Sequence, residues 1–151
     1  MSHVATIDLE IKDLDALAAA AKFIGLEFVK GQETYKWYGS HVGDYPLPQG
    51  FKASELGKCE HALRIPKSEN TSENCYEVGV VRRRDGKPGY TLLWDFWNRG
   101  YGLQDKIGDN GSRLKQEYAA AVATRHAQRQ GYRVTRTQKE DGRVILTASK
   151  S

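Results

Sequence analysis

Two helical segments, each ended by a glycine and followed at once by a strand-like run, constrain this fold more than any other feature. In residues 13–25, Asp13 is placed to cap a helix whose apolar side chains recur at helical spacing as far as Gly25. In residues 112–131, Ser112 is the expected cap and Gly131 the expected end. Because each helix leads directly into a strand, we expect two related halves of β-α-β-β type.

The strand signals agree with this order. Residues 4–11 alternate between apolar and polar side chains, which predicts a strand with one buried face. Residues 76–84 and 90–97 form the clearest hairpin, and the second of these runs is apolar on both faces, as in a central strand. We expect further hairpins at residues 26–38, joined at Gly31-Gln32, and at residues 132–148.

Together these elements predict an α+β fold with an antiparallel-rich sheet and two helices packed on one face. The arrangement would be ferredoxin-like or TATA-binding-protein-like. At 151 residues the chain has the size of a single domain, 1–151. The expected irregularity is an insertion at about 39–75, which ends in a wholly polar, mobile loop at 67–74.

Cysteine usage and the N-terminus indicate a cytoplasmic protein with free thiols. Only Cys59 and Cys75 are present, too few for a disulfide-built scaffold. The opening residues have neither a basic nor an apolar region of a signal peptide. The longest apolar stretch, 14–24, is too short to span a bilayer, so we expect no membrane association.

The opening Met1-Ser-His-Val-Ala-Thr-Ile7 and the helix start Ile11-Lys-Asp-Leu-Asp-Ala-Leu17 resemble an uncharacterised protein family. That family includes a conserved open reading frame of algal chloroplast genomes, with cyanobacterial, bacterial and phage-encoded relatives. The C-terminal runs Gln130-Gly-Tyr-Arg-Val and Glu140-Asp-Gly-Arg-Val are similar to it too, whereas residues 39–75 show no match. The resemblance implies a compact cytosolic or organellar domain of unknown function, in the host cytoplasm if the chain is phage-encoded.

Few residues are candidates for catalysis or metal binding. Cys59 and His61 are two apart, and Cys75 and His41 would complete a four-ligand set, but these positions lack the paired spacing of a zinc site. The same Cys59–His61 pair has no nucleophile motif around it. The glycines of residues 100–111 match no phosphate-binding pattern. We therefore expect no catalytic residues, no metal and no cofactor, and a protein that is not an enzyme.

Basic charge is concentrated near the C-terminus. Residues 1–60 hold 6 Lys/Arg against 9 Asp/Glu, whereas residues 112–151 hold 9 against 3. The first functional hypothesis is therefore a small basic protein that binds nucleic acid through phosphate contacts. The residues predicted to make these contacts are Arg82, Arg83, Arg84, Lys87, Arg125, Arg129, Arg133 and Arg136. This hypothesis requires the arginines to converge on one face.

The alternative hypothesis is a protein-interaction module that regulates or inhibits a larger host or phage machine. Its contact surface would be the irregular segment 41–66 together with an exposed sheet face. Several aromatic side chains would offer contact surfaces if exposed: Tyr35, Trp37, Tyr38, Tyr45 and Trp97. Burial tendencies place Trp37, Trp94 and Phe96 in the core instead. His3, one residue before the first strand, has no packing role that the sequence reveals; capping a sheet edge and contacting a partner both stay open.

Overall fold

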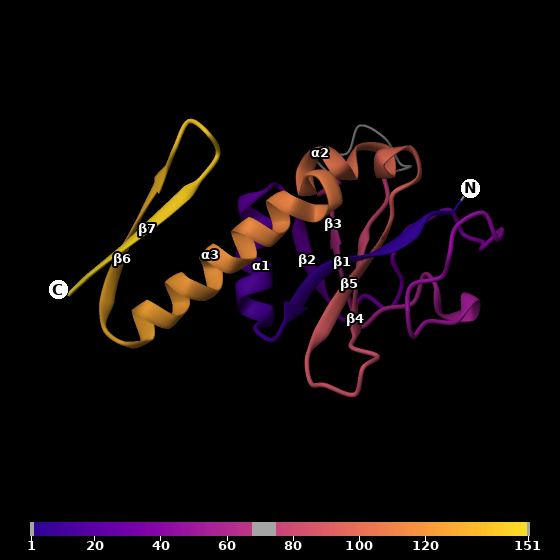
Figure 1. Cartoon of the computed structure of the whole chain (residues 1–151), viewed down its shortest axis with the longest axis horizontal. Helices are drawn as coiled ribbons and strands as arrows, with labels where there is room; N and C mark the ends of the chain where they lie inside the picture. Colours follow the sequence, from indigo (N-terminus) through magenta and orange to yellow (C-terminus); the bar gives the residue numbers. More distant parts are fainter. Residues whose placement is uncertain (1, 68–74, 151) are drawn as a thin grey trace.

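A five-stranded antiparallel sheet, in the order β1-β5-β4-β3-β2, forms the centre of the molecule (Figure 1). The computed structural model describes residues 2–67 and 75–150. The strands are β1 (Val4–Ile11), β2 (Glu27–Lys30), β3 (His61–Arg64), β4 (Val78–Arg82) and β5 (Tyr90–Asp95). The predicted hairpin is confirmed as β4 and β5, and β5 is paired on both sides, which explains why both of its faces are apolar.

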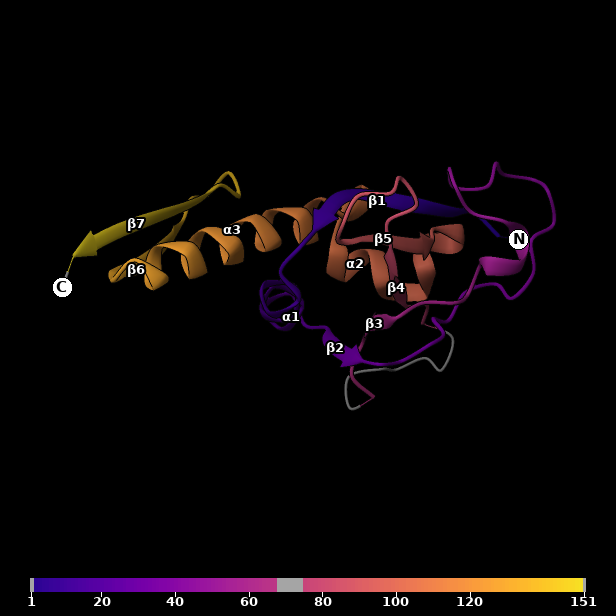
Figure 2. The same ribbon diagram turned by 90° about the horizontal axis from the view of Figure 1, so that it is seen from below.

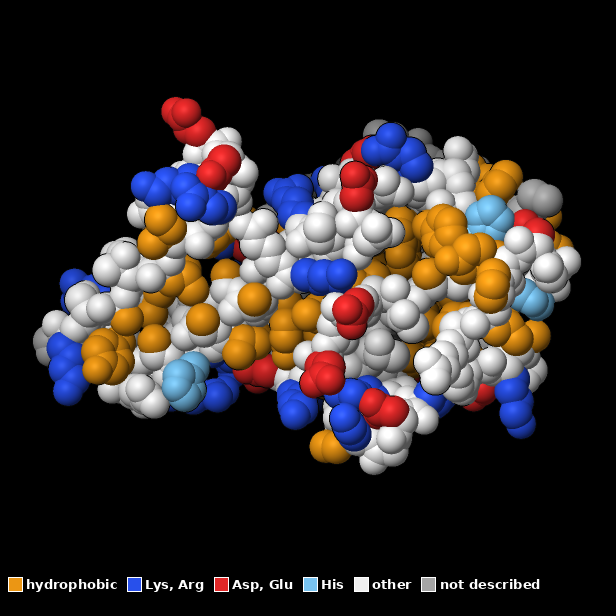
Figure 3. All heavy atoms as spheres, in the orientation of Figure 1, with side chains coloured by type: hydrophobic (Ala, Val, Ile, Leu, Met, Phe, Trp, Pro, Cys, Tyr) orange, Lys and Arg blue, Asp and Glu red, His pale blue; other side chains and the backbone are white. Residues whose placement is uncertain are grey.

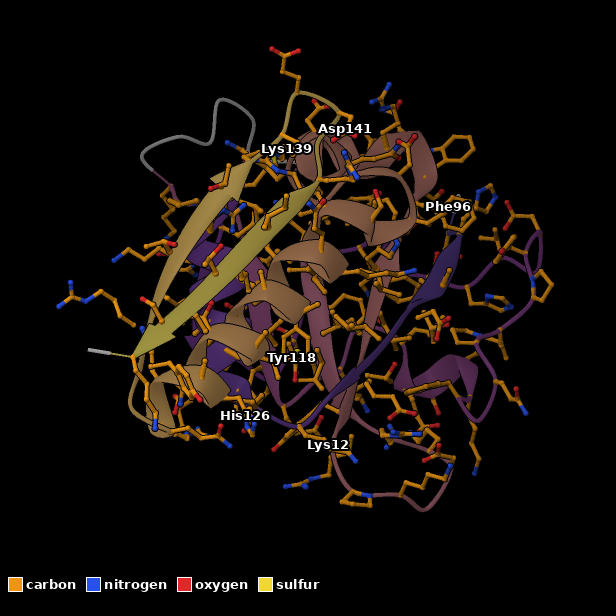
Figure 4. All side chains as sticks on the ribbon, turned by 60° about the vertical axis from the view of Figure 1, so that its left-hand side comes forward. Lys12, Phe96, Tyr118, His126, Lys139 and Asp141 are labelled. Atoms are coloured by element: carbon orange, nitrogen blue, oxygen red, sulfur yellow. The ribbon has the colours of Figure 1, made fainter. Side chains whose placement is uncertain are left out.

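Three helices cover one face of this sheet and close the larger core. They are α1 (Leu14–Phe23), α2 (Leu103–Ile107) and α3 (Ser112–Arg129); α1 and α3 are the two expected there, and the short α2 is a third. Asp13 caps α1 by accepting the N–H of Ala16 at 3.0 Å. Tyr118 of α3 joins the helix layer to the sheet, because its hydroxyl lies 3.1 Å from the backbone N–H of Lys12, just beyond β1 (Figure 4).

The irregular segment covers the opposite face of the sheet and closes a second, smaller core. Phe51, Leu56 and Cys59 pack there against Val81 and Leu93, and η1 (Ala53–Glu55) is the single helical turn expected near residue 54. The strand predicted at 34–38 is wrong, since only one isolated bridge, between Thr34 and Lys58, is formed. Tyr35 is buried here with its ring against Gly79, where even a Cβ atom would approach the ring to 2.3 Å.

The C-terminal hairpin differs from the predicted second half. Strands β6 (Tyr132–Gln138) and β7 (Val144–Lys150) pair with each other in a separate two-stranded sheet and do not join the central one. They lie along α3 instead, and the arm formed by α3, β6 and β7 projects beyond the helix layer (Figure 2). We call residues 112–150 the C-terminal arm. The α+β class with an antiparallel-rich sheet is confirmed and is consistent with a ferredoxin-like arrangement, but the two halves do not share one sheet.

The start of α3 differs from the sequence prediction. Ser112 is the first residue of α3 and not its cap; Gly111, in the left-handed region at φ 73°, holds the cap position without a side-chain hydrogen bond. The predicted mobile loop 67–74 lies, apart from Lys67, outside the described residues. Within residues 2–67 and 75–150, none of the helices combines the length and apolar content needed to cross a bilayer.

Candidate functional site

The basic residues of the β4–β5 turn are engaged within the chain. Arg83 forms ion pairs with Glu10, at 3.1 Å, and with Asp85. These carboxylates raise the pKa of the Arg83 guanidinium, the bond to Asp85 having the larger effect. Arg84 pairs with Glu55 at 3.2 Å and stacks on a phenylalanine ring, while Arg82 lies over a tyrosine ring, 5.5 Å from its centroid. Lys87 lies at the exposed tip, where its backbone N–H donates to Asp85.

The four predicted arginines of the C-terminal arm form a second group. Arg125 pairs with Asp13 at 3.0 Å, and Arg129 approaches the same carboxylate at 3.9 Å. Arg136 makes a two-pronged ion pair with Glu117, at 2.6 and 2.8 Å, which raises the pKa of the guanidinium. Arg133 is exposed.

These two groups do not form a single patch. The β4–β5 turn lies at the lower centre of the view and the end of α3 lies at its left (Figure 1). Acidic side chains lie among the basic ones at the lower centre of the surface (Figure 3). Because most of the predicted guanidinium groups already contact carboxylates, the convergence that phosphate binding requires is not what the structure shows.

The Cys59–His61 pair is not arranged for chemistry. The Cys59 thiol donates to the carbonyl of Gln32 at 3.1 Å, and its burial raises the pKa to about 12. His61 Nδ1 instead accepts the N–H of Gly31 at 2.9 Å, and its partial burial lowers the pKa of the imidazole. A protonated thiol and an imidazole bonded elsewhere do not make a nucleophile and base. The described residues also contain no group of three or more potential metal ligands.

The most distinctive surface lies where the N-terminus meets the end of β5. The ring of His3 sits among three aromatic rings, with centroid distances of 5.4 Å to Tyr45, 5.2 Å to Phe96 and 5.3 Å to Trp97. Its Nε2 lies 2.9 Å from Asp44 Oδ2. His3 therefore packs as the centre of an aromatic cluster and ties the irregular loop to the sheet, a role that the sequence left open.

A fully buried carboxylate holds this region together. Asp95, the last residue of β5, accepts backbone N–H groups from His3 and Trp97 at 3.0 Å each and from Tyr38 at 3.1 Å. Three separate parts of the chain thus converge on one side chain. Because one buried side chain accepts all three bonds, it fixes the backbone beneath the aromatic rings.

The next turn is conformationally strained. Four successive residues of η2 (Trp97–Gly102), from Asn98 to Tyr101, have φ between 48° and 66°, the left-handed region that side chains with a Cβ disfavour. This turn presents the Tyr101 ring at the surface, 5.0 Å from the centroid of buried Tyr76. Backbone strain of this kind clusters at functional sites.

We call this surface the aromatic end. It comprises His3, Tyr38, Tyr45, Phe96, Trp97 and Tyr101. Tyr38 is 45% exposed and Tyr45 38%, and the neighbouring loop adds Val42 at 51%. Hydrophobic side chains gather around a histidine at the right of the surface view (Figure 3). Such a surface is suited to excluding water from a contact.

Sequence reasoning found part of this surface. Tyr38, Tyr45 and Trp97 were among the aromatic residues expected to offer contact surfaces, and Trp94 is buried as expected. Phe96 and Trp37, expected in the core, are half-buried and pack against the edges of the larger and the smaller core. Tyr101 was missed because its glycine-flanked position reads as an ordinary loop; its only signal was a large aromatic between two glycines.

Comparison with known proteins adds a family but no chemistry. A family model described as a protein of unknown function (DUF1257) matches residues 49–147, more than half of the chain. The matched range includes the C-terminal pattern that resembles an uncharacterised family, but not the opening residues. No curated protein and no solved structure matches the chain.

Proposed function

Since the chain belongs to the DUF1257 family, a family of unknown function, we propose from its geometry that it is a non-enzymatic protein-interaction module that binds a partner protein through the aromatic end. One observation carries the proposal. Tyr38, Val42 and Tyr45 are each at least 38% exposed, although they border a cluster that the fold holds in place through buried Asp95.

Exposed aromatic side chains on an ordered base are typical of protein interfaces. Tyr and Trp are enriched at interfaces and among the residues that contribute most binding energy. Contiguous exposed apolar surface on a small domain generally marks a contact region. Tyr45 and the neighbouring Val42 lie in the irregular segment 41–66, which the alternative hypothesis assigns to the contact surface of an interaction module.

Nucleic-acid binding is the second candidate, and one observation favours it. Arg129 is 65% exposed despite its contact with Asp13, Arg133 is exposed, and the region from residue 112 onward carries a net charge of +6. Phosphate contacts at these side chains would produce affinity that falls steeply with salt. The paired state of the other predicted arginines makes this the weaker proposal.

The test compares the aromatic end with a control surface in a pull-down from nuclease-treated extract. The double variant Tyr38→Ser/Tyr45→Ser removes two exposed rings. Val122→Ala is the matched control, because Val122 is 36% exposed on α3, away from the aromatic end. We expect the wild type and the control to retain the same partner protein in stoichiometric amount, and the double variant to lose it.

Two results would count against this function. The first is equal retention by all three proteins. The second is a gel shift with DNA or RNA at low salt that Arg129→Gln/Arg133→Gln abolishes and that the aromatic variant leaves intact. That second outcome would favour the nucleic-acid candidate.

A further inference from the structure

The hairpin of the C-terminal arm has an open edge along β6. Lys139 N–H donates to the carbonyl of Arg143 at 2.8 Å, which fixes the alternation of hydrogen bonds along the antiparallel pair. Because alternate residues of an antiparallel strand direct their N–H groups to the partner, the amides of Thr135 and Thr137 also point toward β7. The backbone groups that point away from β7 are those of Tyr132, Val134, Arg136 and Gln138. Among the described residues, no third strand pairs with them.

An apolar groove runs beside this edge. Its volume is about 410 Å³, and it is lined by side chains of α1, α3 and both hairpin strands. Its apolar lining includes Ala19, Phe23, Ala121, Val134 and Leu146. Arg136 of β6 stacks on the Phe23 ring of α1, 4.1 Å from its centroid, so β6 lies beside the end of α1. A strand added to β6 would therefore lie over the small side chains of the two helices.

We propose that this groove binds an extended, acidic peptide segment of a partner protein, which adds to β6 as a third strand. The main-chain bonds would be made by the outward amides and carbonyls of β6, and alternate side chains of the peptide would enter the groove. An extended peptide held between an open strand edge and a helix is an established mode of recognition. An isolated two-stranded sheet also gains stability from a further strand.

Charge identifies the occupant as acidic. The region from residue 112 onward holds 9 Lys/Arg against 3 Asp/Glu. Exposed Arg133 lies on β6 itself, and Arg129 at the end of α3 keeps 65% of its side chain exposed. A second copy of this chain, paired edge to edge through β6, would bring two such positive arms together and is disfavoured by their repulsion.

The probe is a fluorescein-labelled peptide that alternates valine and glutamate over seven residues, the length of β6, and binding is followed by fluorescence anisotropy at low salt. We expect saturable binding. The same peptide with lysine in place of glutamate should bind more weakly by about tenfold or more, because its positive charge is repelled by the positive charge of the arm.

Two proline variants separate the edges of the hairpin. Val134→Pro removes an outward N–H from β6, whereas Ala148→Pro removes the outward N–H of the facing residue on β7. Proline is tolerated at edge positions whose N–H faces solvent, so β6 and β7 should remain paired in both variants. We expect Val134→Pro to weaken peptide binding about tenfold or more. Ala148→Pro should change it by less than about twofold, since it leaves the β6 edge intact.

A second pair of variants guards against misfolding at Val134. Ala19→Trp fills the groove from an exposed position on α1, and Ala123→Trp adds the same bulk on α3 outside the groove. Only the first should weaken binding. The proposal is overturned if the acidic peptide does not bind, if the lysine peptide binds as well, if both proline variants behave alike, or if light scattering shows a dimer that Val134→Pro dissociates. The proposal does not depend on the aromatic end, so Tyr38→Ser/Tyr45→Ser should leave peptide binding unchanged.

Discussion

The two ends of the molecule are fastened to the central sheet in different ways. At the aromatic end, three backbone N–H groups converge on the buried carboxylate of Asp95. In the C-terminal arm, the hairpin is held to the helices through side chains: Arg136 pairs with Glu117 and stacks on Phe23, and Gln116 of α3 donates to the Gly142 carbonyl at 2.7 Å. Asp95 belongs to the central sheet and is fully buried, whereas Arg136 and its partners lie outside that sheet, so we expect the hairpin to detach while the sheet stays folded.

This difference in attachment matches a difference in the exposed surfaces. The aromatic end offers fixed rings, which suit a preformed contact between folded proteins. The arm offers an open strand edge and a groove, which suit a segment that becomes ordered on binding. We therefore expect the free energy of local unfolding to be lower for the arm than for the aromatic end. Variants at each of the two attachment points test this order of stability.

The largest expected effect is the loss of the buried carboxylate. Asp95→Ala leaves three part-buried backbone N–H groups without the acceptor that the fully buried Asp95 side chain provides. We expect the free energy of unfolding of the whole domain to fall by about 3–5 kcal/mol, because each buried unsatisfied donor carries its own desolvation cost. Urea unfolding followed by tryptophan fluorescence and by circular dichroism measures this, and the two probes should give coincident transitions.

Asp95→Asn is the matched control for that experiment. Its carbonyl oxygen can still accept the two N–H groups now bonded to Oδ1, but its NH₂ group would face the N–H of Tyr38. We expect an intermediate loss of about 1–3 kcal/mol. A neutral Asp95→Ala would mean that the aromatic end is held by packing alone, and the contrast between the two ends would collapse.

The second effect is confined to the arm. Arg136→Met removes the partner of Glu117, whose side chain is only 6% exposed. Breaking a largely buried ion pair on one side is strongly destabilising, by about 3 kcal/mol. We expect amide hydrogen exchange to accelerate at Thr135 and Thr137 of the hairpin and to stay slow in β5. Because a well-packed apolar pair often replaces a buried ion pair without loss, Arg136→Met/Glu117→Leu should recover most of the protection. Equal acceleration in β5 would show that the arm does not open separately.

The sequence predicted the central hairpin and both helices because these follow from local patterns. Alternation in residues 90–97, the Asp13 cap and the glycines after each helix act over a few residues. It did not predict that β6 and β7 leave the sheet, because a hairpin pattern is the same whether its edges are paired or open. The aromatic cluster around His3 was equally hidden, since it joins residues 2–3, 38–45 and 95–97, and the ion pairs of the predicted arginines depend on partners as far away as residue 13.

The smallest expected effect concerns strain, which distinguishes the aromatic end from the arm. Arg99 has φ 56°, and its side chain makes only an exposed ion pair with Asp105, which contributes little. The left-handed conformation costs a residue with a Cβ about 1–2 kcal/mol, and a glycine at the same position avoids this cost. Roughly half of the resulting stabilisation is lost again, because glycine has more conformational freedom in the unfolded chain. Arg99→Gly should therefore stabilise the domain by about 0.5–1 kcal/mol in urea unfolding. Gly100→Ala, one residue on, should have the opposite sign, because its Cβ would approach Leu103 Cβ to 2.9 Å. The same variant can be tested for retention of the partner protein. If Arg99→Gly weakens this retention while it stabilises the domain, the strained conformation that presents Tyr101 contributes to binding at a cost in stability.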